Sequence, residues 1–122
     1  PTRTMARLLS LTHDDVYLYH FTEQFILPDY PALGAFHTAE IPFLFESSYM
    51  GGQLQTDQIP LSDAMVGYWT SFAATGTPNL DGEPTWPPYE VETDQHMLFG
   101  QELQIGRDLK SDLCDFWYQI FM

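Results

Sequence analysis

The residue whose type and position best suit chemistry is His37, in the apolar stretch LGAFHTAEIPFLF at residues 33–45. Glu40 follows it three residues later. An imidazole gains or loses a proton near neutral pH, so it can act as a general base, ligate a metal or serve as a hydrogen-bonded structural group. The residues around His37 leave these roles open, and composition alone favours the structural one.

A metal site is the least supported of these roles. The chain has no HExxH motif and no pair of cysteines, which are patterns of known zinc sites. His37 and Glu40 would share one side of a helix, but the nearby Gly34 and Pro42 argue against a helix at this point. The other histidines offer no short ligand spacing: His13, His20 and His96. We expect no metal and no cofactor.

Nucleophilic catalysis requires a nucleophile within reach of the imidazole and an acid that orients its second nitrogen. In one chain order of this triad, a serine in a G-x-S-x-G turn comes first and the histidine comes last. No serine of this chain stands in that motif: Ser10, Ser47, Ser48, Ser62, Ser71 and Ser111. A segment that holds only the histidine would be the last third of such an enzyme.

Length and composition predict one globular domain. The chain has 122 residues, 44% hydrophobic and 16% aromatic, which is enough apolar surface for a core. The net charge is −13, and the only cations lie near the two ends: Arg3, Arg7, Arg107 and Lys110. This balance excludes nucleic acid and anionic membrane surfaces as partners. It predicts a solvated acidic surface, with the steering of a cationic ligand as the alternative.

The ends of the chain and its cysteine give further expectations. No apolar run reaches the length of about 18 residues that a membrane span requires. No signal peptide is visible, and the chain begins at Pro1 rather than Met, which suggests processing or a piece of something longer. Cys114 is the only cysteine. Taken alone, it favours a buried thiol over half of a disulfide whose partner lies outside this sequence.

Residues 16–21, VYLYHF, predict a buried strand, and MARLLSLTHDD before them fits the end of a helix followed by a turn. LPDYPALG contains two prolines and a glycine and must be a loop. His37 therefore lies in a loop that closely follows a strand, where functional sites are often built. EIPFLF fits a short helical turn, because proline cannot donate to a strand ladder. SSYMGGQLQTD is a further loop.

The clearest helix spans residues 62–75, with Ser62 as its expected N-cap and Gly76 as the residue that ends it. Its apolar face is expected in the core: Met65, Tyr68, Trp69 and Phe72. HMLFG and ELQIG fit two short strands or one bent strand, and residues 108–120 a second helix. This order predicts an α/β fold, as part of a sheet with flanking helices that is incomplete on its own.

Five stretches follow one another along the chain: VYLYHF, LGAFHTAEIPFLF, MVGYWTSFAATGTPN, WPPY and CDFW. In this order and with these gaps they resemble the C-terminal region of the type-B carboxylesterase family, which includes cholinesterases, carboxylesterases and fungal lipases. The second stretch is similar to the family signature G-x-x-H-x-x-E-[IL]-x-[FY]-[VL]-F. The resemblance runs from about Val16 to Phe121.

The resemblance implies that residues 1–122 form the C-terminal third of an α/β-hydrolase domain. It implies that His37 is the triad histidine, a general base in acylation and a general acid toward the leaving alcohol. Glu40 would be a buried acid near the site but outside the triad. The triad serine, its acid partner and the oxyanion loop would lie upstream of Pro1. The partner would then be the N-terminal part of the same esterase, and the substrate a small-molecule ester.

For Cys114 the resemblance implies a disulfide to an upstream cysteine, and hence an oxidising compartment such as the secretory pathway. Four apolar residues either wall the acyl or alcohol pocket or belong to the core, and the core is the plainer expectation: Leu33, Phe36, Phe43 and Phe45. We expect the isolated chain to hydrolyse no ester, because the triad needs three groups. The alternatives are a non-catalytic esterase-like interaction module and a truncated inactive fragment.

Overall fold

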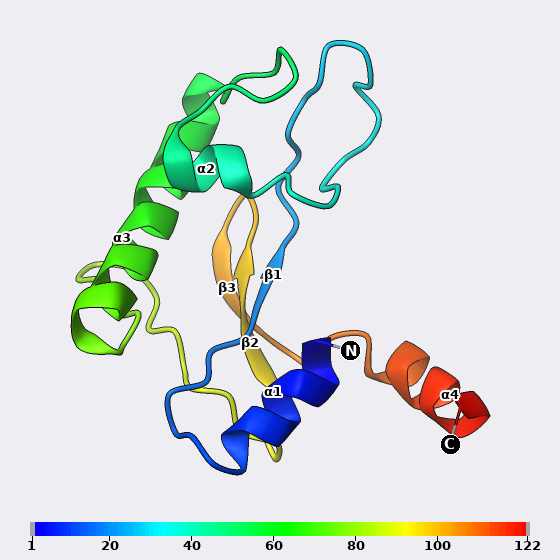
Figure 1. The fold of residues 1–122 in the computed structure, drawn as a ribbon. Helices are drawn as coiled ribbons and strands as arrows, with labels where there is room; N and C mark the ends of the chain where they lie inside the picture. The colour runs from blue at the N-terminus through cyan, green and yellow to red at the C-terminus, as the bar shows by residue number, and fades with distance from the viewer. Residues whose placement is uncertain (1, 122) are drawn as a thin grey trace.

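The structure, a computed structural model, describes residues 2–121 and is built on a small mixed sheet (Figure 1). Its strands are β1 (Tyr19–Phe21), β2 (Gln95–Phe99) and β3 (Leu103–Arg107), in the order β1-β2-β3. β1 pairs with β2 in parallel, with Tyr19 opposite Met97, and β2 pairs with β3 in antiparallel. The parallel pair is joined by a long crossover that carries helices, as such a pair requires.

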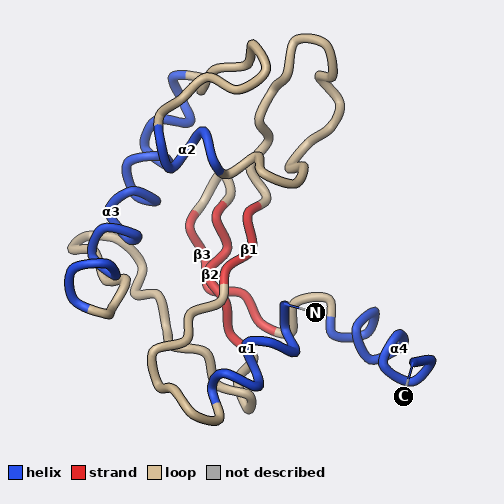
Figure 2. The backbone as a smooth tube through the Cα atoms, in the orientation of Figure 1, coloured by secondary structure: helices blue, strands red, loops and turns tan. Residues whose placement is uncertain are grey.

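The helices lie around this sheet (Figure 2). They are α1 (Thr2–Ser10), α2 (Ile41–Phe45), α3 (Ile59–Thr75) and α4 (Ser111–Phe121), with a 3-10 turn at Thr56–Gln58 before α3. α2 and α3 belong to the crossover between β1 and β2, and α4 extends away from the rest of the chain (Figure 1). This agrees with the expected part of an α/β sheet with flanking helices. No helix within residues 2–121 is long and apolar enough to cross a membrane.

The main core lies between the sheet and α3. Alternate residues of β2 point to opposite faces, so Met97 and Phe99 face α3 and are completely buried. Tyr68 of α3 packs edge-on against Phe99 with ring centroids 5.8 Å apart. The indole nitrogen of Trp86 donates to the Leu18 carbonyl at 3.1 Å. Long-range aromatic contacts thus hold α3 and the proline-rich loop against the strands.

A second, polar contact fixes α1 beside the start of β2. Asp94 is 2% exposed and accepts bonds from Arg3 and from the Tyr89 hydroxyl, the latter at 2.8 Å. Arg7 lies 3.6 Å from the same carboxylate. Ala6 of α1 packs in a small apolar cluster that includes Tyr89. The two arginines of α1 therefore point inward, toward the only buried carboxylate of the described residues.

Several sequence-based expectations are confirmed. A helix and turn precede β1, α2 forms a short helical turn, and β2 and β3 are two separate strands. Gly76 ends α3 with φ +81°, and its amide donates to the Phe72 carbonyl at 2.8 Å. The core face expected for α3 is confirmed only in part: Met65 and Tyr68 are buried and Trp69 is half-buried, but Phe72 is exposed and not in the core.

The expected N-cap of α3 is wrong. The helix begins at Ile59, its N-cap is Gln58, and Pro60 lies in its first turn, where a proline costs no hydrogen bond. Gln55 and Gln58 form a capping box on the 3-10 turn that precedes α3. Ser62 therefore lies inside the helix, completely buried.

Two further boundaries differ from expectation. The ladder of β1 covers only Tyr19–Phe21, which are half-buried rather than buried. The Val16 and Leu18 carbonyls before it accept from the Tyr89 and Met97 amides instead. α4 begins at Ser111 rather than at 108, because Asp108 and Lys110 both have φ +52°, which no helix residue adopts.

Candidate functional site

His37 lies in a tight turn between the loop after β1 and helix α2. The Ala39 amide donates to the Phe36 carbonyl at 3.0 Å, and the Ile41 amide donates to the Thr38 carbonyl at 3.1 Å. The Glu40 carbonyl then accepts from Phe43 at 3.1 Å. The turn therefore continues into α2 through overlapping backbone bonds, so that α2 and the turn form one unit.

The turn holds the imidazole outward. Thr38 has φ +77°, a conformation that a β-branched residue adopts only when its surroundings impose it. The next residue, Ala39, is completely buried, whereas His37 is exposed. Among the described residues no side-chain hydrogen bond engages the His37 ring. The ring is therefore carried on a constrained backbone with both nitrogens free to meet groups outside this chain.

Aromatic contacts hold the His37 turn in place. Phe36 packs against Phe25 with ring centroids 6.5 Å apart and stacks on Tyr49 at 6.4 Å. Phe43 packs edge-on against Phe21 at 5.1 Å and against Phe25 at 6.3 Å. The residues on both sides of His37 are thus tied to the loop after β1 and to β1 itself.

Glu40 is half-buried at the start of α2, less buried than expected. It is the N-cap of that helix, but its side chain makes no capping bond. Burial raises the pKa of Tyr19, and the negative charge of Glu40 raises it further. The Glu40 carboxylate is therefore close enough to Tyr19 of β1 for its charge to act on the phenol.

The four apolar residues near His37 do not share one environment. Phe43 is completely buried and belongs to the core, and Phe36 is half-buried against it. Leu33 is 52% exposed and Phe45 is 72% exposed. Of these four residues, only Leu33 and Phe45 expose more than half of their surface in the described chain.

Sequence reasoning missed the contact that Ser62 makes. Its hydroxyl donates to the Phe43 carbonyl at 2.5 Å, and both residues are completely buried. The interaction links α3 to the helix that follows the His37 turn. No local pattern signals it, because the two residues are 19 positions apart and the sequence favours Ser62 as a helix cap.

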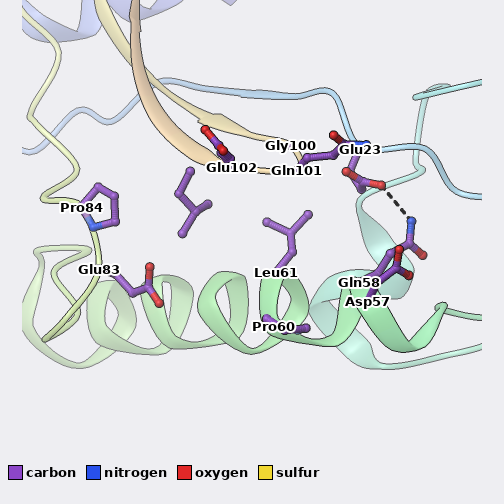
Figure 3. A pocket seen from close by; sticks show the side chains of 11 residues that line it. Glu23, Asp57, Gln58, Pro60, Leu61, Glu83, Pro84, Gly100, Gln101 and Glu102 are labelled. Carbon is purple, nitrogen blue, oxygen red and sulfur yellow. Dashed lines mark hydrogen bonds between the residues drawn. The ribbon is translucent and has the colours of Figure 1, made fainter.

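An open cleft of about 570 Å³ lies at the carboxyl ends of β1 and β2, beside the start of α3 (Figure 3). Its carboxylates are Glu23, Asp57, Glu83 and Glu102. The Gln58 amide spans part of it and donates to Glu23 at 2.9 Å and to the Gln24 carbonyl at 2.6 Å. His37 does not line this cleft, and no motif in the sequence predicted the cleft.

The remaining titratable groups form no metal centre. Within residues 2–121 no three side chains of the metal-ligating types converge. His20 and His96 lie face to edge with ring centroids 6.2 Å apart, on neighbouring strands. Burial lowers the pKa of each ring, and their mutual charge lowers that of His96 further. Cys114, on α4, is a half-buried free thiol.

Comparison with known proteins agrees with the family that the sequence resembles. The model of the carboxylesterase family matches residues 1–117. Human cocaine esterase is 34% identical over 110 residues, which are 84% of this chain and 19% of that protein. Mouse acylcarnitine hydrolase is 34% identical over 114 residues, 87% of this chain and 20% of that protein.

A third relative, bovine bile salt-activated lipase, is 30% identical over 118 residues, 88% of this chain and 19% of the lipase. The chain thus spans about a fifth of the length of the curated relatives that it matches. The matched residues 1–117 include β1, the His37 turn, α3 and the β2–β3 pair. The chain belongs to the carboxylesterase family.

Proposed function

We propose that this chain is the C-terminal segment of a carboxylic-ester hydrolase with the α/β-hydrolase fold, and that His37 is its catalytic histidine. The observation that carries the proposal is the exposed imidazole on a constrained turn after β1, within a chain that the carboxylesterase model matches over residues 1–117. A general base must be held in one place and still reach its nucleophile. The constrained backbone at Thr38 and the exposed ring of His37 support this role.

In this proposal the nucleophilic serine, its acid partner and the oxyanion hole come from the part of the protein that precedes this chain. The imidazole takes the serine proton as the hydroxyl oxygen attacks the ester carbonyl, and returns it to the departing alcohol. Water then attacks the acyl-enzyme with help from the same ring. Glu40 contributes negative charge beside the turn, and the exposed Leu33 and Phe45 contribute to the wall of the ester pocket.

The surface of the chain supports the need for a partner segment. No residue of α4 is buried, and its exposed side chains include Phe116, Trp117 and Ile120. An apolar surface of this kind marks a contact site. We propose that the preceding part of the esterase covers it, and that Cys114 forms a disulfide with that part in an oxidising, secretory compartment.

Ester hydrolysis by the protein as its natural gene encodes it tests this function. We expect turnover of a p-nitrophenyl ester, and a loss of about a thousandfold or more when His37 is replaced by alanine. His13→Ala is the matched control, because His13 is also exposed but lies in the loop after α1. Equal turnover by the wild-type and His37→Ala proteins would reject the catalytic role.

The pH dependence gives a second test. A histidine base must be neutral, and an imidazole takes up its proton between about pH 5 and 8. The rate is expected to fall as the pH is lowered through this range. A flat profile would contradict a histidine base.

The 122-residue chain alone is expected to hydrolyse no ester above background, because it supplies one member of a three-membered triad. Purified chain is assayed with the same ester. Saturable turnover that disappears in His37→Ala would show that the chain carries its own nucleophile.

The relatives are named for different substrates. The proposed function is therefore hydrolysis of an ester bond, without a particular substrate.

A further inference from the structure

We propose that Ser62 is a positioning residue for His37, because its hydroxyl fixes α2 against α3 and α2 carries the His37 turn. This inference rests on the proposed function, since it concerns the same imidazole. It assigns to a serine of α3 a role in ester hydrolysis that does not involve contact with the substrate.

The Ser62 hydroxyl gives the Phe43 carbonyl a hydrogen-bond donor that α2 does not supply. The helix has five residues, so its last carbonyls lack partners within it. The Glu46 and Ser47 amides both turn back to the Pro42 carbonyl. The next carbonyl, that of Phe43, accepts the Ser62 hydroxyl at 2.5 Å in a completely buried position. Without this hydroxyl a buried acceptor would lose its donor.

The geometry of Ser62 is unusual for a hydroxyl inside a helix. Such a group commonly bonds to a carbonyl one turn earlier in its own helix. Thr70 of α3 does so, because its hydroxyl donates to the Val66 carbonyl at 2.7 Å. The Ser62 hydroxyl instead reaches another helix, 19 residues away. Its bond therefore connects two elements, whereas that of Thr70 stays within one.

The connection from Ser62 to His37 is short and made of backbone bonds. Phe43 donates to the Glu40 carbonyl at 3.1 Å, and Ile41 donates to the Thr38 carbonyl at 3.1 Å. These bonds connect α2 to Thr38, and the Ala39 amide, which donates to the Phe36 carbonyl at 3.0 Å, closes the turn around His37. A five-residue helix is not stable alone, so its place depends on the elements it packs against, which are α3 and the rings of Phe21 and Phe25. A shift of α2 would move the imidazole with it.

Ester kinetics of the natural full-length protein test the proposal with Ser62→Ala. Since a displacement of about 1 Å at a catalytic group costs up to a hundredfold in rate, we expect kcat to fall about tenfold to a hundredfold, with a smaller change in KM. Ser71→Ala is the control, because Ser71 is on the same helix and its hydroxyl donates to the Thr77 carbonyl at 2.9 Å. It should leave kcat unchanged.

Amide hydrogen exchange on the same proteins separates positioning from general destabilisation. We expect faster exchange of the Ala39 and Ile41 amides in Ser62→Ala, with the amides of β2 unchanged. Unchanged kcat and unchanged exchange would overturn the proposal. A fall in kcat that matches a lower folded fraction, with faster exchange along the whole chain, would also overturn it. If Ser62→Ala does not fold, Ser62→Cys, which keeps the size and weakens the donor, is measured instead.

The two proposals fail differently. If the wild-type protein hydrolyses no ester, the proposed function fails, and exchange at Ala39 and Ile41 still decides whether Ser62 holds the turn. If wild-type turnover depends on His37 but Ser62→Ala changes neither kcat nor exchange, only the role of Ser62 is lost.

Discussion

Gly106 of β3 lies directly opposite His96 of β2, and the imidazole fills the space where a side chain of residue 106 would be. A Cβ at this position would lie 2.6 Å from Cε1 of His96. The ring is almost completely buried, and its Nδ1 has no hydrogen-bond partner among the described residues. The pairing of β2 with β3 therefore depends on a residue without a side chain.

Gly106→Ala is expected to lower the free energy of unfolding by about 1–3 kcal/mol, because the added methyl group overpacks a filled site. Urea denaturation measures it. The double variant with His96→Ala is the control, since removal of the ring should recover most of the loss. Additive effects of the two changes would show that the ring is not the obstacle.

Acidification below about pH 6.5 is expected to destabilise the fold through the same ring. Burial lowers the pKa of His96, and the His20 ring lowers it further, whereas Asp94 acts in the opposite direction. Burial and then Lys110 lower the pKa of His20. The two rings therefore bind protons more readily in the unfolded chain than in the folded chain. The free energy of unfolding falls as the pH drops through the pKa that histidine has in the unfolded chain.

Urea midpoints at pH 7.5 and 5.5 measure this dependence. His96→Gln should reduce the difference between the two midpoints, whereas His13→Gln, which changes an exposed ring, should leave it as in the wild type. An unchanged difference in His96→Gln would exclude this ring as the cause.

Asp94→Asn is expected to destabilise the chain by about 3–5 kcal/mol, because it removes the buried counter-charge of the mostly buried Arg3 guanidinium. Asp115→Asn is the matched control. Asp115 lies 3.4 Å from the same arginine but its side chain is 64% exposed, so its loss should cost about 1 kcal/mol or less. Equal effects of the two changes on the urea midpoint would contradict this assignment.

The same carboxylate gives a second, more acidic pH dependence. Burial alone would raise the pKa of Asp94, but hydrogen bonds from Arg3 and Tyr89 outweigh it and lower the pKa below its ordinary value. Its contribution to stability is present above about pH 4 and is lost as the pH falls through the folded value. Below pH 4, wild-type stability should therefore decline more steeply than that of Asp94→Asn.

Gly76→Ala is expected to cost about 1 kcal/mol, because φ +81° at the end of α3 suits glycine and strains alanine. Thermal melting measures the loss. Gly76→Asn should lose less, since asparagine tolerates the left-handed conformation better. Equal melting temperatures for Gly76→Ala and the wild type would mean that the helix end relaxes without cost.

The elements of this fold follow largely from short-range signals in the sequence. Gly76 and Pro78 determine where α3 ends, because one adopts positive φ and the other cannot continue a helix. The prolines and Gly34 place His37 in a loop after a strand, and Pro42 favours a short helix over a strand. The motif around His37 likewise indicates the family without any knowledge of contacts.

Only the tertiary structure shows which polar side chains are buried and which distant groups they bond. The sequence favours Ser62 as a helix cap, yet its hydroxyl lies inside α3 and donates to the Phe43 carbonyl of another helix, 19 residues away. Asp94 gives no local sign that it will be buried against Arg3, 91 residues away. Caps and turns depend on neighbours within a few residues, whereas buried polar bonds depend on where distant segments meet, and only the folded chain brings those segments together.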